Sequence, residues 1–440
     1  MLSASNNMGN GVVMPNNAAD NLNELYFKPS SEDIPRVLLL GYNGANNTGS
    51  EARLLTIIND IKAILGPEAL ITVPTLNKEN LERYLKEDKF LKIAPISSIF
   101  FFDIRKLVKE HDILLLVEGS CYMDTWTSAL LWAFLWATKC ANDFKKPSIA
   151  YAVDVGQLSS FNRWLVKREA SKTDLILTRT ELAAQELGKM GVKAPILTTA
   201  DCALTFKTEK EDDEILNELW PKSDSGVVGL APVDFYLWPV VMRPWGKKEN
   251  LYKWPYYYSR SKWRTEGSEQ LALKWAEEAD RIIEKHGKRV ALICMEELDE
   301  PLALCINNKM KNSDMAKIFS SRKYNASTMT SILKSLELLV TSRYHAGVLS
   351  LEAQVPQIAV GHDTRLRGFY KELGLENYLL DYMSSEIWYK LEEKVNELLE
   401  NPETQQKLLK NGFIQHIARA RKNPEILRNF LQKRGWKVKV

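Results

Sequence analysis

One stretch of the sequence, residues 336–369, restricts the fold more than any other part of the chain. It reads LELLVTSRYHAGVLSLEAQVPQIAVGHDTRLRGF. The apolar run 338–341 is short enough to be a buried strand, and small and apolar residues at helical spacing follow it. Pro356 ends this helix, and residues 357–360 form a second short apolar run. The stretch therefore predicts a β-α-β unit, which requires two parallel strands in a sheet covered by helices.

Two side chains of this unit, Arg343 and His345, fall at the carboxyl end of its first strand. Open α/β sheets bind ligands at that edge. A guanidinium can hold a carboxylate or a phosphate through two hydrogen bonds, and an imidazole can transfer a proton near neutral pH. A second polar cluster follows the second strand and would line the same edge: His362, Asp363, Arg365 and Arg367. The structural alternative is that His345 caps the helix and Arg343 pairs with a surface acid.

The alternation of strand and helix recurs on both sides of one charged segment, residues 207–225. Before it, short apolar runs predict strands at 37–41, 70–73, 112–117, 148–153, 175–178 and 196–198. After it, the pattern restarts at 226–232. We therefore expect a disordered N-terminus (1–33), a first lobe (34–206), a linker (207–225), a second lobe (226–383) and a C-terminal helical region (384–440).

Composition and charge exclude several classes of protein. The formal net charge of +3 over 440 residues is small, and no basic run resembles a nucleic-acid-binding arm. No spacing typical of a zinc site occurs, and we expect neither a metal nor a cofactor. The five cysteines are odd in number and scattered, which favours reduced thiols in a cytosolic compartment.

The sequence shows no membrane-targeting pattern. The N-terminus lacks the basic start and apolar core of a signal peptide. The most hydrophobic run, ALLWAFLWA at 129–137, is shorter than the ~20 apolar residues that a membrane span needs. It predicts a helix buried on most faces, with contact to a membrane or a partner as the alternative. We expect a cytoplasmic protein, with peripheral contact to the inner face of the membrane left open.

A glycine-rich loop at 41–49 separates the first predicted strand from a helix for which Ser50 is the expected N-cap. Glycines at such a place let the backbone approach a ligand closely. Their spacing matches neither a dinucleotide fingerprint nor a P-loop. The loop therefore indicates either a site for an oxyanion or a sugar hydroxyl, or a turn without a ligand.

Two further segments carry unusual side chains. Residues 234–264 combine four tryptophans, three consecutive tyrosines and seven basic residues. Aromatic faces can stack on sugar rings, and basic groups can hold phosphates or anionic lipid headgroups, so this segment could contact a membrane. The alternative is an insertion that packs on itself. The acidic cluster at 295–300 could act as a base, bind a cation, or simply start a solvated helix.

Taken in order, these motifs resemble the polysaccharide pyruvyl transferase family over residues 37–375. Asn47, Gly49 and Glu51 match the family's glycine-rich opening, and DILLLVEGS (112–120) matches its strand with a triple glycine. Arg179 matches its strand-end arginine, and Asp201 matches the aspartate of its Ala-Asp-x-Ala motif. Residues 342–375 match its Arg-x-His block. Three places depart from the pattern: Ser50 replaces an aspartate, Glu118-Gly119-Ser120 replaces three glycines, and Arg365 replaces a lysine.

The resemblance implies an α/β fold of two Rossmann-like lobes with parallel sheets, similar to the GT-B glycosyltransferase fold, with a C-terminal helical tail. It implies transfer of pyruvate from phosphoenolpyruvate to a sugar, free or lipid-linked, of a cell-surface polysaccharide or its precursor, giving a ketal. His345 is then the expected proton donor. The expected donor-binding residues are Arg343, Tyr344, Asp363 and Arg365, and the expected acceptor-binding residues are Asn47, Gly49, Glu51, Gly119 and Arg179.

Two other functions remain as alternatives. A glycosyltransferase that uses a nucleotide sugar could be built on the same two-lobed scaffold, because fold alone does not determine activity. It would need a pocket for a base and a ribose in the second lobe. A non-catalytic sugar-binding homologue is the other alternative, and the change at residues 118–120 motivates it.

Overall fold

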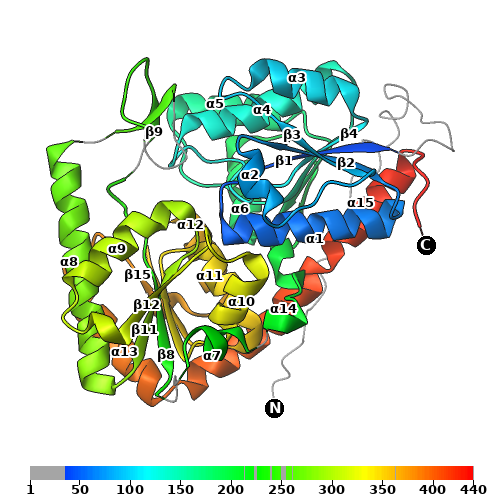
Figure 1. Cartoon of the computed structure of the whole chain (residues 1–440). Helices are drawn as coiled ribbons and strands as arrows, with labels where there is room; N and C mark the ends of the chain where they lie inside the picture. Colours follow the sequence, from blue (N-terminus) through cyan, green and yellow to red (C-terminus); the bar gives the residue numbers. More distant parts are fainter. Residues whose placement is uncertain are drawn as a thin grey trace, which may run out of the picture.

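The computed structural model describes residues 35–212, 214–221, 225–237, 240–248, 254–259, 261–361 and 363–439. The chain forms two α/β lobes that face each other, and the C-terminal helices run from the second lobe back to the first (Figure 1). The predicted fold class is therefore confirmed. The segment predicted to be disordered, residues 1–33, lies outside the described residues.

The first lobe is built on a seven-stranded parallel sheet in the order β3-β2-β1-β4-β5-β6-β7. Its strands are β1 (Arg36–Leu40), β2 (Leu70–Thr75), β3 (Leu91–Pro95), β4 (Ile113–Leu116), β5 (Ser148–Val153), β6 (Leu175–Thr178) and β7 (Ile196–Thr198). The chain runs outward from β1 to β3 and then returns to place β4 on the other side of β1. The loops after β1 and β4 therefore diverge at the carboxyl edge, where such sheets form a ligand crevice.

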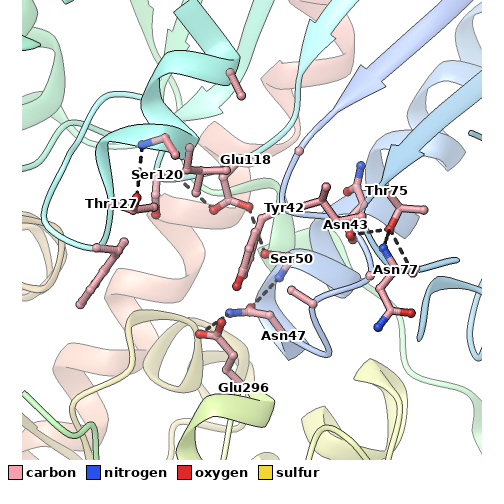
Figure 2. A pocket seen from close by; sticks show the side chains of 18 of the residues that line it. Tyr42, Asn43, Asn47, Ser50, Thr75, Asn77, Glu118, Ser120, Thr127 and Glu296 are labelled. Atoms are coloured by element: carbon pink, nitrogen blue, oxygen red, sulfur yellow. Dashed lines mark hydrogen bonds between the residues drawn. The ribbon is translucent and has the colours of Figure 1, made fainter. Parts of the chain in front are cut away.

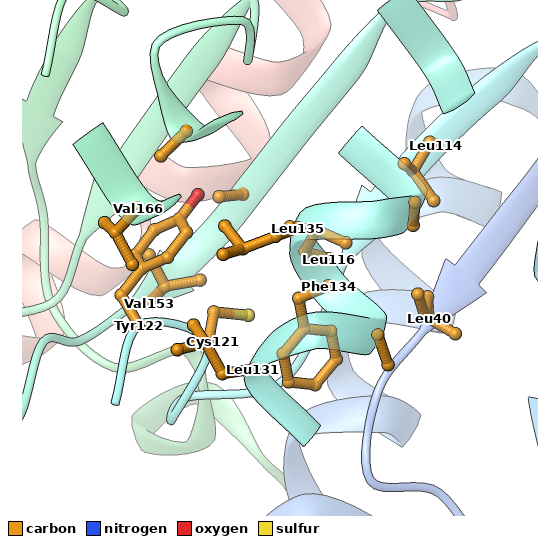
Figure 3. Packing of buried hydrophobic residues seen from close by; sticks show 14 of the residues in the cluster. Leu40, Leu114, Leu116, Cys121, Tyr122, Leu131, Phe134, Leu135, Val153 and Val166 are labelled. Carbon is orange, nitrogen blue, oxygen red and sulfur yellow. The ribbon is translucent and has the colours of Figure 1, made fainter. Parts of the chain in front are cut away.

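Alternate residues of the central strands pack against two layers of helices, because strand side chains point to opposite faces. Leu38 and Leu40 face the layer of α3 (Phe101–Glu110), α4 (Ser128–Asp143), α5 (Ser160–Ala170) and α6 (Glu181–Met190) (Figure 3). Val37 and Leu39 face α1 (Thr48–Leu65), and the short α2 (Lys78–Glu82) follows β2. The apolar run 129–137 lies within α4 and is mostly buried, as predicted.

The second lobe repeats this topology with a six-stranded parallel sheet in the order β12-β11-β8-β13-β14-β15. Its strands are β8 (Val227–Ala231), β11 (Arg289–Cys294), β12 (Ala316–Ser320), β13 (Leu338–Thr341), β14 (Gln357–Val360) and β15 (Leu379–Leu380). One face packs against α8 (Lys262–His286), α9 (Glu300–Lys309) and α13 (Ile387–Glu400). The other packs against α7 (Ile215–Leu219), α10 (Ala326–Lys334), α11 (Tyr344–Ser350) and α12 (Thr364–Leu373).

The two lobes are held together by helices on both sides of their interface. Helix α1 of the first lobe contacts α10 and α11 of the second. Helix α14 (Glu403–Ala420) packs on the second lobe through Leu409, and α15 (Lys422–Lys433) packs on the first through Leu427 and Leu431. The crevices of the two sheets consequently face each other across the interface.

The strands that the sequence did not predict share one property. Strands β3, β12 and β15 are three of the four edge strands of the two sheets, and none is buried along its whole length; the fourth edge strand, β7, was predicted. An edge strand needs no continuous apolar run, so its signal in the sequence is weak. The segment 234–264 also contains an unpredicted antiparallel hairpin of β9 (Val240–Met242) and β10 (Tyr256–Tyr258). Within this segment, residues 238–239, 249–253 and 260 lie outside the described residues, and they include Trp238 and Arg260.

Two further findings concern cysteines and membrane spans. All five cysteines are free thiols, which agrees with the expectation that they form no disulfide framework. Within the described ranges, no helix is both long enough and apolar enough to cross a membrane.

Candidate active site

A cavity of about 340 Å³ lies between the two lobes, at the crevices of both sheets. Part of its polar wall is formed by Tyr42, Asn47, Ser50, Glu118 and Ser120 of the first lobe and by Glu296 of the second (Figure 2). The second lobe also contributes Arg343, Tyr344, His345 and Arg365. The volume lies at the lower end of the ~300–1,000 Å³ that ligand pockets span. Five of the predicted site residues thus line one cavity.

The first turn of α1 joins the lobes beside this cavity. Asn47 is its N-cap, not Ser50 as predicted, because the Asn47 Oδ1 accepts a hydrogen bond from the Ser50 N–H at 3.0 Å. The Asn47 Nδ2 donates to Glu296 Oε2 across the interface at 3.3 Å. The Thr48 N–H donates to the carbonyl of Met295 at 2.9 Å. The helix therefore starts within the glycine-rich segment and positions its first residues against the second lobe.

His345 projects from the start of α11 toward the first lobe. Its Nε2 lies 3.3 Å from Asp201 Oδ2 and 3.4 Å from Arg179 Nη1. Burial lowers the pKa of His345, and the Asp201 carboxylate offsets part of that decrease. The imidazole is consequently neutral at neutral pH in the unliganded protein. It does not cap the helix: Arg343 holds the N-cap position, and its side chain makes no capping bond.

Gly49 lies directly against this imidazole. A Cβ at position 49 would come within 2.0 Å of His345 Nδ1. We expect Gly49→Ala to displace His345 and to lower kcat/KM about 100-fold, since a shift of about 1 Å in a catalytic group can have that effect. Gly188→Ala in α6 is the matched control, because a Cβ there meets no atom within 4 Å.

The two glycine variants are expected to differ in stability as well as activity. Alanine is favoured over glycine in a helix by up to about 1 kcal/mol, so Gly188→Ala should be slightly stabilising. Gly49→Ala should lose that gain to the clash with His345. Urea unfolding and steady-state kinetics on both variants check this. Full activity in Gly49→Ala would show that the position of His345 is not critical.

Behind His345 lies a buried network of ion pairs. Asp201 accepts hydrogen bonds from Arg53 Nη1 at 2.8 Å and from Arg179 Nη1 at 2.6 Å, and Asp154 accepts one from Arg179 Nε at 2.9 Å. These side chains are at most 3% exposed. Burial alone would raise the pKa of Asp201, but the two guanidinium groups hold it well below its usual range. This network fixes Arg179, and with it the surroundings of His345.

Arg343 is paired with buried acids and not with a surface acid. Its Nη1 donates to Glu296 Oε2 at 2.9 Å, its Nε donates to Asp299 Oδ2 at 3.0 Å, and its Nη2 also bonds Asp299. Burial raises the pKa of both carboxyl groups, and the Arg343 guanidinium counteracts part of that rise. The acidic cluster at 295–300 is therefore a partner of the Arg-x-His block, and is neither a solvated helix start nor an isolated cation site.

Arg365 connects the second lobe to the loop after β4. Its Nε donates to Asp363 Oδ2 at 2.8 Å, and its Nη1 donates to Ser120 Oγ of the first lobe at 2.8 Å. Asp363 in turn caps α12 by accepting the Arg365 N–H at 2.8 Å. Asp363 thus orients Arg365. His362, which was predicted at the same edge, lies outside the described residues.

The positions that depart from the family pattern contact one another. The Ser50 Oγ donates to Glu118 Oε2 at 3.1 Å, and the Ser120 N–H donates to Glu118 Oε1 at 3.2 Å (Figure 2). Ser120 then accepts from Arg365. Because these side chains form one hydrogen-bonded chain along the cavity wall, the departures constitute a single local change.

Four of the five predicted acceptor residues do not line the cavity: Gly49, Glu51, Gly119 and Arg179. Gly49 and Arg179 lie against His345 instead. Glu51 is buried against Arg83, which bonds it at 3.3 Å, and burial raises its pKa to about 8. Gly119 lies against Arg179, whose Nη1 would be 2.5 Å from a Cβ at that position. Gly119 therefore gives Arg179 room, and Glu51 belongs to the interface between lobes.

Several residues of the site were not predicted: Arg53, Glu118, Ser120, Asp154, Asp201, Glu296 and Asp299. Asp154 and Asp201 follow predicted strands, and Asp201 also matched a family motif, so a signal existed for these two. Their pairing with Arg179 could not be read from spacing, because it joins three separate strand ends. Among the residues that the structure describes, no group of three or more His, Cys, Asp or Glu side chains is arranged to hold a metal ion.

Comparison with solved structures shows which known fold this chain resembles. Anabaena HepE in complex with UDP-glucose is 12% identical, with a TM-score of 0.57, and the match covers 90% of this chain and 99% of that one. A putative UDP-N-acetylglucosamine 2-epimerase from Listeria monocytogenes is 13% identical, with a TM-score of 0.58, and covers 93% and 100%. Both have the GT-B fold, and at such low identity the likeness concerns the fold alone.

Sequence comparison identifies the family. A search of curated protein sequences finds no match. The family profile described as polysaccharide pyruvyl transferase matches residues 47–364, which include the glycine-rich opening of α1 and the Arg-x-His block. On this match over most of its length, the chain belongs to the polysaccharide pyruvyl transferase family.

Proposed function

We propose that this protein transfers pyruvate from phosphoenolpyruvate to two hydroxyl groups of a saccharide of the cell envelope or its precursor, forming a cyclic ketal. The observation that carries the proposal is that Arg343, His345 and Arg365 line one cavity opposite Asn47 and Ser50. The cavity therefore combines a proton carrier, two cations for an anionic donor, and hydrogen-bonding groups for a hydroxylated acceptor.

The two arginines can bind a donor anion although both are already paired with acids. A guanidinium has five N–H groups. The contacts described above use three N–H groups in Arg343 and two in Arg365, and the Arg365 Nη2 also bonds Asp363. Two N–H groups of each guanidinium therefore remain for the carboxylate and phosphate of phosphoenolpyruvate. The carboxylates hold both guanidinium groups in place before the donor arrives, which is the kind of preorganisation that stabilises developing charge.

The proposed reaction begins with proton transfer from His345 to the methylene carbon of phosphoenolpyruvate. A sugar hydroxyl then attacks the resulting cationic carbon, the bond to phosphate breaks, and a second hydroxyl of the same sugar closes the ketal ring. Of the two protons released by the hydroxyls, one restores the proton of His345 and the other leaves with phosphate. The products are the pyruvate ketal and inorganic phosphate, with charge and atoms balanced.

The proton-donor role makes activity dependent on pH. In the free enzyme burial lowers the pKa of His345 below 6.5, so the protonated fraction falls about tenfold per pH unit above it. We therefore expect kcat/KM, which reports the free enzyme, to fall as pH rises. Bound phosphoenolpyruvate brings negative charge that favours the imidazolium, so kcat should fall only at higher pH. Profiles of kcat and kcat/KM measured above pH 7 check this, and a kcat/KM that rises with pH would contradict it.

The direct test of the activity is phosphate release from phosphoenolpyruvate in the presence of candidate saccharides. The proposal expects release that depends on both substrates, and a product whose mass has gained a pyruvate ketal. Arg365→Lys, which preserves the charge, is expected to retain part of this activity. Arg365→Ala is expected to lose most of it. If Arg365→Ala retained as much activity as Arg365→Lys, Arg365 would not be a donor-binding residue.

A further inference from the structure

One carboxylate on the cavity wall, that of Glu118, has no part in the reaction described so far. Glu118 follows β4 and is 6% exposed, and its side chain lines the cavity between the lobes. The proposed reaction releases two protons from the hydroxyl groups of the acceptor, and His345 needs only one of them to recover its starting state. The other proton needs a group that carries it to the leaving phosphate.

The hydrogen-bond partners of the Glu118 carboxylate are uncharged. The Ser50 hydroxyl donates to its Oε2 at 3.1 Å, and the Ser120 N–H donates to its Oε1 at 3.2 Å (Figure 2). Within the residues that the structure describes, this carboxylate takes part in no ion pair, whereas Glu296 on the same cavity wall is paired with Arg343 at 2.9 Å. A carboxylate has about four lone-pair sites, so the two bonds leave room for a substrate hydroxyl.

Glu118 also lies between the groups assigned to the two substrates. On one side, Ser120 bonds Glu118 through its N–H, and its hydroxyl accepts a hydrogen bond from Arg365 Nη1 at 2.8 Å. Arg365 is the expected ligand of the donor anion. On the other side, Ser50 connects Glu118 to the first turn of α1, where Asn47 lines the part of the cavity assigned to the acceptor. A proton taken up by Glu118 is therefore close to both substrates.

A second observation concerns the two positions at which this chain departs from the family pattern. The pattern has an aspartate at position 50 and a glycine at position 118, whereas this chain has Ser50 and Glu118. The Ser50 Oγ is 3.1 Å from Glu118 Oε2, so a side chain from either position can bring a carboxylate to nearly the same point. Two carboxylates there would repel each other. The two departures are therefore complementary: the carboxylate has moved from the helix to the loop, and the cavity wall keeps one.

We propose that Glu118 is the base that removes the proton of the attacking sugar hydroxyl, in place of the aspartate that the family pattern has at position 50. This rests on the proposed function, because it names a catalytic residue of the same reaction. As the hydroxyl oxygen bonds the ketal carbon, its O–H bond breaks and the proton passes to Glu118. As the bond from that carbon to the phosphate oxygen breaks, Glu118 gives the proton to this oxygen and is a carboxylate again. The proton of the second hydroxyl restores His345.

The first test replaces the carboxylate with a group of the same shape that cannot take up a proton. Glu118→Gln is expected to lower kcat for phosphate release about 10²–10⁴-fold, measured with phosphoenolpyruvate and the saccharide that supports release by the unmodified protein. Glu118→Asp keeps a carboxylate and should retain more activity than Glu118→Gln. Glu110→Gln, at an exposed position on α3, is the matched control and should retain full activity. Equal turnover in Glu118→Gln and Glu110→Gln would overturn the proposal.

The second test moves the carboxylate back to the helix. Glu118→Gly removes the base and is expected to lose as much activity as Glu118→Gln. The double variant Ser50→Asp/Glu118→Gly again has one carboxylate at this point of the wall, and its kcat should be at least tenfold above that of Glu118→Gly. Such non-additivity is expected only of side chains that share a site. A double variant no more active than Glu118→Gly would contradict the exchange of roles between the two positions.

Thermal unfolding of the same variants gives a readout that needs no turnover. Ser50→Asp should lower the Tm when Glu118 is present, because two carboxylates then face each other, and should not lower the Tm of Glu118→Gly. An equal effect in both backgrounds would show that the two side chains do not share one point. The rise in Tm with phosphoenolpyruvate should persist in Glu118→Gln, which also reports that this variant is folded.

The two proposals fail in different ways in this experiment. Absence of phosphate release from the unmodified protein with every saccharide would count against the proposed function, and would leave the comparison of Tm values intact. Phosphate release by the unmodified protein that persists undiminished in Glu118→Gln would count against Glu118 as the base and would leave the proposed function in place.

Discussion

Replacing His345 with alanine is expected to lower kcat about 10²–10⁴-fold, the contribution typical of a positioned general acid. The structural reason is that His345 lines the same cavity as Arg343 and Arg365 and lies directly against Gly49 of the first-lobe loop. Protonation of the methylene carbon creates the cationic centre that the sugar attacks. Without His345 as the proton donor, the remaining rate depends on substrate binding and on the fixed charges around the donor.

The His345 experiment needs a control for structural damage, because the imidazole also contacts Asp201 and Gly49. His286→Ala on α8 removes a histidine that bonds Asn396 at 2.8 Å away from the cavity, and it should retain full activity. Thermal stabilisation by phosphoenolpyruvate should persist in His345→Ala, since the arginines remain. Near-normal turnover in His345→Ala would show that this histidine is a packing residue.

Replacing Asp201 with asparagine is expected to destabilise the protein by about 3–5 kcal/mol, the typical loss when one partner of a buried ion pair is removed. The change leaves Arg53 and Arg179 with one carboxylate fewer, and both guanidinium groups are 0% exposed. A buried charge without its partner loses hydration and gains nothing in return. Urea unfolding of the purified variant measures the free energy directly.

A partly exposed pair provides the contrast for Asp201. Asp112 bonds Arg36 at 2.9 Å, but the Arg36 side chain is 50% exposed, so Asp112→Asn should change stability by about 1 kcal/mol or less. The sign of the pH effect follows from the low native pKa of Asp201. Ionised Asp201 contributes its full stabilisation of the folded protein above the pKa of an aspartate in the unfolded chain, which is about 4. That stabilisation is lost as the pH falls toward the lower pKa of Asp201 in the folded protein. An Asp201→Asn variant as stable as Asp112→Asn would contradict this role.

The sequence predicted the central part of each sheet because those strands are buried on both faces. Parallel strands of that kind appear as short, continuous apolar runs, as at residues 113–116 and 338–341. Three of the four edge strands, β3, β12 and β15, were missed because only part of each is buried. The N-cap of α1 was placed three residues late, because Asn47 and Ser50 are both good N-cap residues and only the fold selects between them.

The sequence predicted that three residues would share one edge of the second sheet, because each follows the end of a strand. Arg343, His345 and Arg365 follow strands of one β-α-β unit, and the structure places all three on the cavity wall. Prediction did not extend to their partners. Arg343 pairs with Glu296 and Asp299 from another strand end, and Arg365 reaches Ser120 in the other lobe. Such pairings depend on how two lobes dock, which no local spacing encodes.

The paired arginines also bear on how a donor would bind. A cavity with unpaired cations would attract any phosphate, including that of a nucleotide. Here Arg343 and Arg365 are paired with three carboxyl groups, those of Glu296, Asp299 and Asp363, so no excess of formal positive charge remains. Binding then depends on geometry more than on total charge, which favours a small donor with two anionic groups at fixed separation.

The most direct test of this account is a thermal-shift titration of the unmodified protein and Arg365→Ala with phosphoenolpyruvate and with UDP-glucose. A ligand present at 100 times its Kd stabilises the native state by about 2.7 kcal/mol. The account predicts a rise in Tm with phosphoenolpyruvate that Arg365→Ala loses, and no comparable rise with UDP-glucose. A rise with UDP-glucose and none with phosphoenolpyruvate would contradict it and would assign the cavity to a nucleotide-sugar transferase.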